Sequence, residues 1–189
     1  MKNPALFVCD IQTKFEKAIH AWPHVVSTSR KLLSASTILS IPVYYTTQLR
    51  EKLGDTVPSL VVRDPALDID KSLFSMCTPE LLQSLPPGSD VAIVGIEAHI
   101  CVTQTTLDLL QHGHRVYIVA DGVSSCNAAE VPIALRRLAG AGATVTTSES
   151  FIYQVTRDAK VDNFKAIAQL VKESKESTRA ALENMPGCK

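Results

Sequence analysis

Short apolar runs alternate with helix-like stretches along the whole chain, and this alternation is what most strongly limits its fold. The strand-like runs lie at residues 6–9, 42–46, 67–70, 91–94, 116–119 and 144–146. Helical patterns lie at 24–39, 79–85, 101–111, 130–138, 161–172 and on towards 182. Repeated strand–helix units build a parallel sheet with helices on both faces and right-handed crossovers. The sequence therefore predicts a Rossmann-like, three-layer α/β/α fold with a six-stranded parallel sheet.

The chain length fits one domain. With 189 residues, 46% of them apolar, it can bury a sizeable core. We expect this domain to span residues 1–182, followed by a loose C-terminal tail at 183–189. The one long irregular segment, 48–65, exceeds the usual connection length and is expected to be an active-site or interface loop.

Composition argues against several classes of protein. The 19 basic residues balance 19 acidic ones, so there is no basic excess of the kind expected of a nucleic-acid binder. No apolar run approaches the roughly 20 residues of a membrane span. A strand-like run begins close to the N-terminus and leaves no room for a signal peptide, which favours a cytoplasmic protein. The five cysteines lack CxxC spacing, so reduced thiols are expected rather than disulfides or zinc.

Three reactive side chains follow predicted strands. Asp10 ends the first strand, Lys71 ends the third, and Cys101 opens a helix after the fourth. Ligands of such folds bind at the carboxyl ends of the strands. A helix N-terminus stabilises a thiolate, Asp10 can accept the thiol proton, and Lys71 can keep that carboxylate ionised. The three together indicate a nucleophilic cysteine with its base and a balancing charge.

The sequence around these residues resembles a known family. The blocks are Asp-Ile-Gln at 10–12, Lys-Ser-Leu-Phe-Ser-Met at 71–76 and Gly-Ile-Glu-Ala-His-Ile-Cys-Val at 95–102. They are similar to the isochorismatase-like cysteine hydrolase superfamily, in particular to the eukaryotic isochorismatase domain-containing proteins. The resemblance covers essentially the whole chain and implies the isochorismatase-like hydrolase fold.

The resemblance also implies roles for individual residues. Asp10, Lys71 and Cys101 correspond to the family's catalytic triad. A cis peptide bond is expected between Ile96 and Glu97, where the Glu97 N–H would join that of Cys101 in an oxyanion hole. The family commonly forms dimers or tetramers, so a homo-oligomer is expected.

The chain departs from the family's patterns in ways that bear on chemistry. Nicotinamidases of the superfamily carry an Asp-x-His metal motif after the second strand, whereas residues 46–54 contain no histidine. We therefore expect no metal and no other cofactor, and nicotinamide loses support as the substrate. True isochorismatases do not depend on a cysteine nucleophile, so Cys101 favours amide or similar acyl chemistry.

Further side chains lie near the predicted crevice. Gln12, Phe15, Thr46 and Phe74 are candidates for substrate binding, although each could simply pack. His99, two residues before the cysteine, is a candidate for substrate contact. A role for His99 as the catalytic base, as in papain-like enzymes, is the less favoured interpretation.

The sequence thus predicts a metal-independent cysteine hydrolase acting on a small amide, imide or related carbonyl compound through a covalent intermediate on Cys101. Two alternatives stay open. One is a catalytically silent family member that serves as an oligomeric binding or scaffold protein. The other is a ribonuclease, because some relatives carry that label. The physiological substrate cannot be read from the residues.

Overall fold

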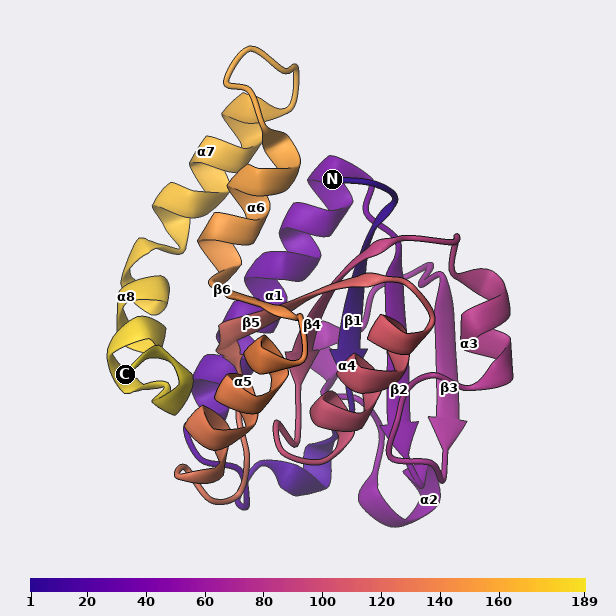
Figure 1. Cartoon of the computed structure of the whole chain (residues 1–189). Helices are drawn as coiled ribbons and strands as arrows, with labels where there is room; N and C mark the ends of the chain where they lie inside the picture. The colour runs from indigo at the N-terminus through magenta and orange to yellow at the C-terminus, as the bar shows by residue number, and fades with distance from the viewer.

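Six parallel strands form the central layer of the protein in the computed structural model, which describes all 189 residues (Figure 1). Their order across the sheet is β3-β2-β1-β4-β5-β6. The strands are β1 (Pro4–Cys9), β2 (Val43–Gln48), β3 (Leu67–Lys71), β4 (Asp90–Gly95), β5 (Arg115–Val123) and β6 (Thr144–Thr146). The predicted six-stranded parallel sheet is confirmed. Strand β2 lies between β1 and β3 and pairs with both.

Helices cover both faces of the sheet, as predicted. Figure 1 shows α4 and α5 in front of the sheet, with α1 behind it and α6 to α8 grouped at one side. The helices are α1 (Trp22–Leu39), α2 (Arg50–Leu53), α3 (Pro79–Ser84), α4 (Cys101–Gln111), α5 (Glu130–Gly140), α6 (Ser148–Thr156), α7 (Phe164–Glu173) and α8 (Lys175–Asn184). Three 3-10 turns complete the chain: η1 (Thr13–Phe15), η2 (Pro58–Leu60) and η3 (Pro186–Cys188). None of the helices combines the length and the apolar character that crossing a bilayer requires.

The two faces of the sheet carry separate hydrophobic clusters. Along β1, Leu6 and Val8 pack on the side of α1, α6, α7 and α8, while Phe7 and Cys9 pack on the side of α3, α4 and α5. Strands buried on both faces need apolar residues at successive positions. This requirement explains the continuous apolar runs in the sequence, and it fixes the carboxyl end of β1 at the centre of the sheet.

The last residues are not loose, which corrects the expected tail at 183–189. Met185 is fully buried in the cluster beside α1. Gly187 approaches the side chains of Leu135 and Val131 so closely that a Cβ there would contact both. The sequence does not reveal this packing because the segment is short, and one buried methionine has no periodic pattern to identify it.

Asp90 anchors the start of β4 and gives a first test of the fold. Its carboxylate accepts hydrogen bonds from the Lys2 N–H at 2.6 Å and from the Arg115 guanidinium, whose Nη2 lies at 2.7 Å. Burial alone would raise the pKa of Asp90, but the hydrogen bonds from Arg115 and Lys2 outweigh it and lower the pKa. We expect Asp90→Asn to lower the unfolding free energy by about 1–3 kcal/mol at pH 7.

The pH dependence of that difference follows from the lowered pKa. The stabilisation is fully present above the ordinary aspartate pKa of about 4 and is lost as the pH falls through the lower pKa of the folded state. Urea unfolding of both proteins at pH 7 and near pH 2.5 measures the difference. A difference that stays the same at both pH values would contradict the role of the Asp90 charge.

Candidate active site

The carboxylate of Asp10 is held at the carboxyl edge of the sheet, directly after β1. Its Oδ1 accepts a hydrogen bond from the Thr46 hydroxyl at 2.7 Å, and its Oδ2 accepts one from Lys71 Nζ at 2.8 Å. The side chains of Asp10 and Lys71 are only 2% and 1% exposed. Each carboxylate oxygen therefore has a fixed donor, which sets the orientation of the group.

All three N–H donors of the Lys71 ammonium group are hydrogen-bonded within the protein. Besides Asp10, it donates to Gln48 Oε1 at 2.8 Å and to the carbonyl oxygen of Leu73 at 3.1 Å. An ammonium group has three N–H donors, so none is left for a ligand. Lys71 can thus balance and position the carboxylate, and it reaches Asp10 from the edge strand β3 across β2.

Cys101 is the first residue of α4, as the sequence predicts. The turn before it starts at Gly95, where a Cβ would collide with the carbonyl oxygen of Cys9, so only glycine lets β4 end this close to β1. The Ile96–Glu97 peptide bond is cis. The backbone N–H groups of Glu97 and Cys101 have no acceptor within the protein, which leaves both available to an oxygen of a ligand.

A cavity of about 160 Å³ lies between the Asp10 carboxylate and Cys101. Most of its wall is apolar. The apolar lining residues are Phe15, Leu53, Phe74, Ile96 and Ile100, and the polar ones are Asp10, Gln48, Glu97 and Cys101. The structure thus brings the predicted base and the predicted nucleophile to one small, largely apolar cavity.

The predicted substrate-binding residues divide into two groups. Phe15 and Phe74 line the cavity, whereas Gln12 and Thr46 are fully buried outside its lining. The Gln12 amide donates to the Gly54 carbonyl at 2.7 Å and accepts from the Gln48 N–H at 2.7 Å. Gln12 and Thr46 therefore do not line this cavity: Gln12 is hydrogen-bonded to the backbone of the neighbouring loop, and Thr46 is hydrogen-bonded to Asp10.

His99 also lies outside the lining of the cavity. Its Nδ1 is 2.9 Å from the Ser125 hydroxyl and 3.8 Å from Glu97 Oε2. The same Glu97 oxygen accepts a hydrogen bond from the Cys126 N–H at 3.0 Å. His99 belongs to the polar group around the Glu97 carboxylate, and this geometry does not place it against the thiol of Cys101.

Sequence reasoning missed Gln48, Leu53 and Ile100 as lining residues. Gln48 is the last residue of β2, so the argument that selected Asp10 and Lys71 from strand ends applies to it as well. It was assigned instead to the irregular segment 48–65, which contains the short helix α2 with Leu53. That segment does contribute to the site, as expected of an active-site loop.

The other four cysteines have pKa values above the ordinary range. Burial raises the pKa of Cys77 to about 12 and that of Cys188 to about 11. Burial, and then the neighbouring Cys101 thiol, raises the pKa of Cys9. A hydrogen bond with Glu97 raises the pKa of Cys126. These four side chains therefore stay protonated near neutral pH, where a thiol is a poor nucleophile.

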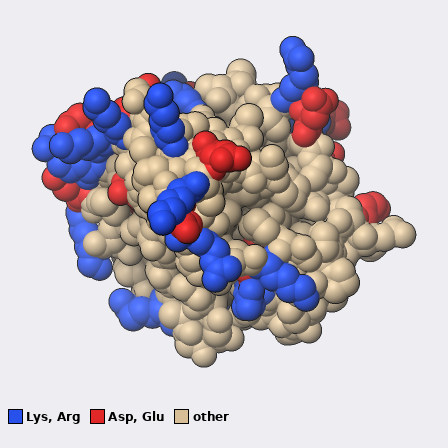
Figure 2. Space-filling model, turned by 90° about the horizontal axis from the view of Figure 1, so that it is seen from above, with Lys and Arg blue, Asp and Glu red and all other residues tan.

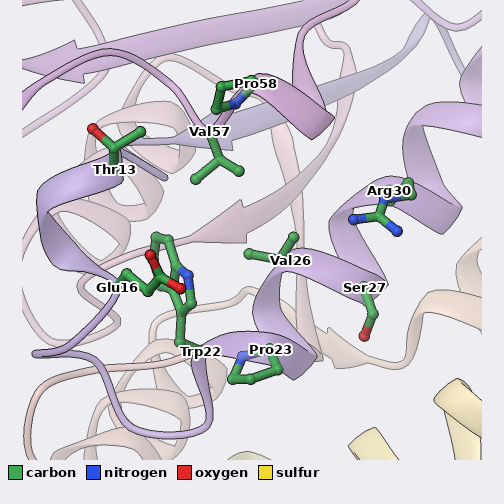
Figure 3. Close-up of a pocket in the computed structure, with 9 residues that line it drawn as sticks. All are labelled: Thr13, Glu16, Trp22, Pro23, Val26, Ser27, Arg30, Val57 and Pro58. Carbon is green, nitrogen blue, oxygen red and sulfur yellow. The ribbon is translucent and has the colours of Figure 1, made fainter.

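A larger hollow, of about 420 Å³, lies beside the start of α1, and no thiol lines it (Figure 3). Thr13, Glu16 and Trp22 line it together with further residues of α1 and η2, and no cysteine is among them. The turn η1 separates the two spaces, since Thr13 faces this hollow while Phe15 lines the smaller cavity. Nowhere in the chain do three or more histidine, cysteine, aspartate or glutamate side chains gather as a metal site would require.

Comparisons with known proteins identify the family and agree with the fold. The family model described as Isochorismatase domain matches residues 4–150. Isochorismatase family protein 1A of Dictyostelium discoideum is 40% identical over 179 residues, covering 90% of this chain and 87% of that protein. The secreted isochorismatase effector Isc1 of Phytophthora sojae is also 40% identical, covering 90% and 85%. The solved structure of MAR1 ribonuclease from Caenorhabditis elegans has a TM-score of 0.85 at 41% identity, covering 90% of each chain.

Proposed function

This chain belongs to the isochorismatase family, a family of hydrolases, and on that premise we propose that it hydrolyses a small amide, imide or related carbonyl compound through Cys101. One observation carries the proposal. A buried carboxylate, oriented on one oxygen by Thr46 and on the other by Lys71, shares a small cavity with the thiol of Cys101. That arrangement supplies a nucleophile, a proton acceptor and a place for an acyl group.

In the first half of the proposed reaction the enzyme is acylated. Asp10 takes the thiol proton while Sγ of Cys101 bonds to the carbonyl carbon of the substrate. The carbonyl electron pair moves onto oxygen, where the free N–H groups of Glu97 and Cys101 stabilise the negative charge. When the carbonyl re-forms, the C–N bond breaks and Asp10 returns the proton to the leaving amine. An acyl thioester remains on the protein.

In the second half, water releases the acyl group. Asp10 accepts a proton from the water, and the water oxygen bonds to the thioester carbon. The S–C bond then breaks, and the sulfur recovers the proton held by Asp10. The sum is one amide and one water converted to one carboxylic acid and one amine. Throughout both halves the Lys71 ammonium stays bonded to Asp10 and compensates its negative charge whenever the carboxyl is ionised.

Selective alkylation tests the nucleophile without knowledge of the substrate. We expect iodoacetamide near pH 7.5 to modify Cys101 before any other cysteine, because Cys101 lies at the first turn of α4 in a cavity that it shares with a proton acceptor, Asp10. Peptide mapping by mass spectrometry at increasing times gives the order of labelling. Faster labelling of another cysteine would count against Cys101 as the nucleophile.

Ammonia release from butyramide, benzamide and nicotinamide then tests turnover.

A ribonuclease is the second candidate, on the strength of the name of the 41% identical Caenorhabditis elegans relative. The cavity offers little to a polyanion, since no lysine, arginine or histidine lines it. On the face seen in Figure 2, lysine and arginine side chains are scattered among acidic and uncharged ones. RNA binding that weakens steeply with added salt, together with RNA cleavage lost in Cys101→Ala, would favour this candidate over the amide hydrolase.

Three further expectations remain predictions. A silent scaffold protein would need no cavity between Asp10 and Cys101, and the 160 Å³ space there argues for turnover instead. A homo-oligomer is proposed from the family resemblance, and Leu73 and Phe74 are apolar side chains more than half exposed at the edge of the site. A cytoplasmic location is proposed from the sequence alone, and one relative at 40% identity is described as secreted.

A further inference from the structure

The ionisable residues that line the cavity are acidic, and none of them is basic. Two acidic residues, Asp10 and Glu97, are among those that line it, and no lysine, arginine or histidine is. The nearest cation, Lys71, is buried behind Asp10 with all three donors bonded to the protein. Resting on the proposed function, we infer that this site selects small, uncharged acyl groups and rejects substrates that carry a carboxylate.

Glu97 is the acidic residue whose charge no lysine or arginine compensates. Lys71 compensates Asp10, but Glu97 has no lysine or arginine partner. Its contacts are the Cys126 N–H and, at 3.8 Å, His99 Nδ1, which is itself 2.9 Å from the Ser125 hydroxyl. Asp10, Lys71, Glu97 and Cys101 together therefore carry one net negative charge, whether the shared proton is on Asp10 or on Cys101 before attack.

The size and the walls of the cavity point to the same class of substrate. Its volume of about 160 Å³ is below the range of about 300–1,000 Å³ typical of sites for drug-sized ligands. Two phenyl rings, from Phe15 and Phe74, contribute to its walls together with aliphatic side chains. An apolar acyl group of on the order of ten non-hydrogen atoms or fewer suits such a space. A dicarboxylate would have to bury charge there without a free cationic partner.

Two nearly isosteric reagents test the inference on Cys101 itself. Iodoacetamide is neutral and iodoacetate is an anion. With both, Sγ of Cys101 forms a bond to the CH₂ carbon, the C–I bond breaks, iodide leaves, and the thiol proton passes to Asp10 and then to solvent. The same two rates measured on 2-mercaptoethanol, an uncharged thiol, correct for the intrinsic reactivity of each reagent.

We expect the normalised iodoacetate rate at Cys101 to be at least about tenfold below the normalised iodoacetamide rate, because an anion in this partly dry site would meet negative charge that no free cation compensates. Glu97→Gln keeps the shape and the acceptor oxygen while removing the charge, and should raise the iodoacetate rate several-fold relative to iodoacetamide. Glu16→Gln removes one charge in the hollow of Figure 3 and should leave the ratio unchanged.

The outcomes separate the two proposals. Equal normalised rates in the unmodified protein would overturn the charge selection and leave the cysteine hydrolase standing. A ratio insensitive to Glu97→Gln but shifted by Glu16→Gln would also overturn it. If neither reagent modifies Cys101, the proposed function fails, and the inference that rests on it fails too. The comparison in the unmodified protein needs no variant, so it decides even if Glu97→Gln folds poorly.

Discussion

Cys101→Ala is expected to lower the rate of amide hydrolysis at least about a thousandfold, because no other thiol and no hydroxyl side chain lines the cavity. A thousandfold loss corresponds to about 4 kcal/mol of transition-state stabilisation. The remaining N–H groups and the Asp10 carboxylate can still bind an amide and polarise it, which would leave a small residual rate. Ammonia release from whichever of butyramide, benzamide and nicotinamide is turned over fastest measures the loss, and iodoacetamide labelling of the site should vanish with it.

The matched control is Cys188→Ser, which removes a partly buried thiol in the turn η3, a segment that contacts α5 and β5 and does not line the cavity. It should keep both the turnover and the labelling of Cys101. Thermal unfolding of both variants checks that they are folded. Turnover by Cys101→Ala that equals the turnover of the unmodified protein would show that hydrolysis does not pass through this thiol.

Lys71→Met is expected to cause the largest loss of stability of any single change at the site. It leaves the buried Asp10 carboxylate with the Thr46 hydroxyl as its one remaining side-chain donor. Breaking a buried ion pair by removing one partner costs about 3–5 kcal/mol. Uptake of a proton by Asp10 would reduce that cost but would also remove the base, so amide hydrolysis should fall by about a hundredfold or more.

The double variant Asp10→Asn with Lys71→Met separates stability from catalysis. Replacing both charges should recover much of the lost unfolding free energy, since no unpaired charge stays buried, while hydrolysis stays low because the base is missing. Urea unfolding and ammonia release measure the two properties on the same samples. If the double variant is as unstable as the sum of the two single variants, the pair is not coupled in the way that the 2.8 Å contact indicates.

Much of the fold follows from the sequence because buried parallel strands leave an unmistakable apolar pattern. The helix α6 (Ser148–Thr156) could not be predicted in this way, because the local preference of its residues does not match its structure. Its residues Phe151, Ile152 and Val155 favour strands by local preference, and packing against α1, β5 and α7 favours the helix instead. Its start is capped by the Thr147 hydroxyl, which accepts from the Ser150 N–H. Tertiary contacts of this kind cannot be inferred from a window of sequence.

The site was predictable where a residue ends a strand or begins a helix. Asp10, Lys71 and Cys101 all hold such positions, so the sheet itself brings their backbones to one edge. Gln12 and Thr46 lie in the same region, yet the direction in which a side chain turns depends on partners far along the chain. Gln12 is bound to the backbone of Gly54, which lies 42 positions away. The sequence could therefore predict which residues lie near the site. It could not predict which of them line the cavity and which bind neighbouring loops.

The cavity wall and the reactive groups come from different kinds of structure. Asp10, Lys71 and Cys101 stand on the ends of regular elements, whereas Phe15, Leu53 and Phe74 belong to short turns or to the segments between them. Mutations in those connections can reshape the acyl pocket while the sheet keeps the reactive groups in register. Such a division lets substrate preference diverge between lineages faster than the chemistry does. Relatives at 40% identity can then share one reaction and differ in the compound that each consumes.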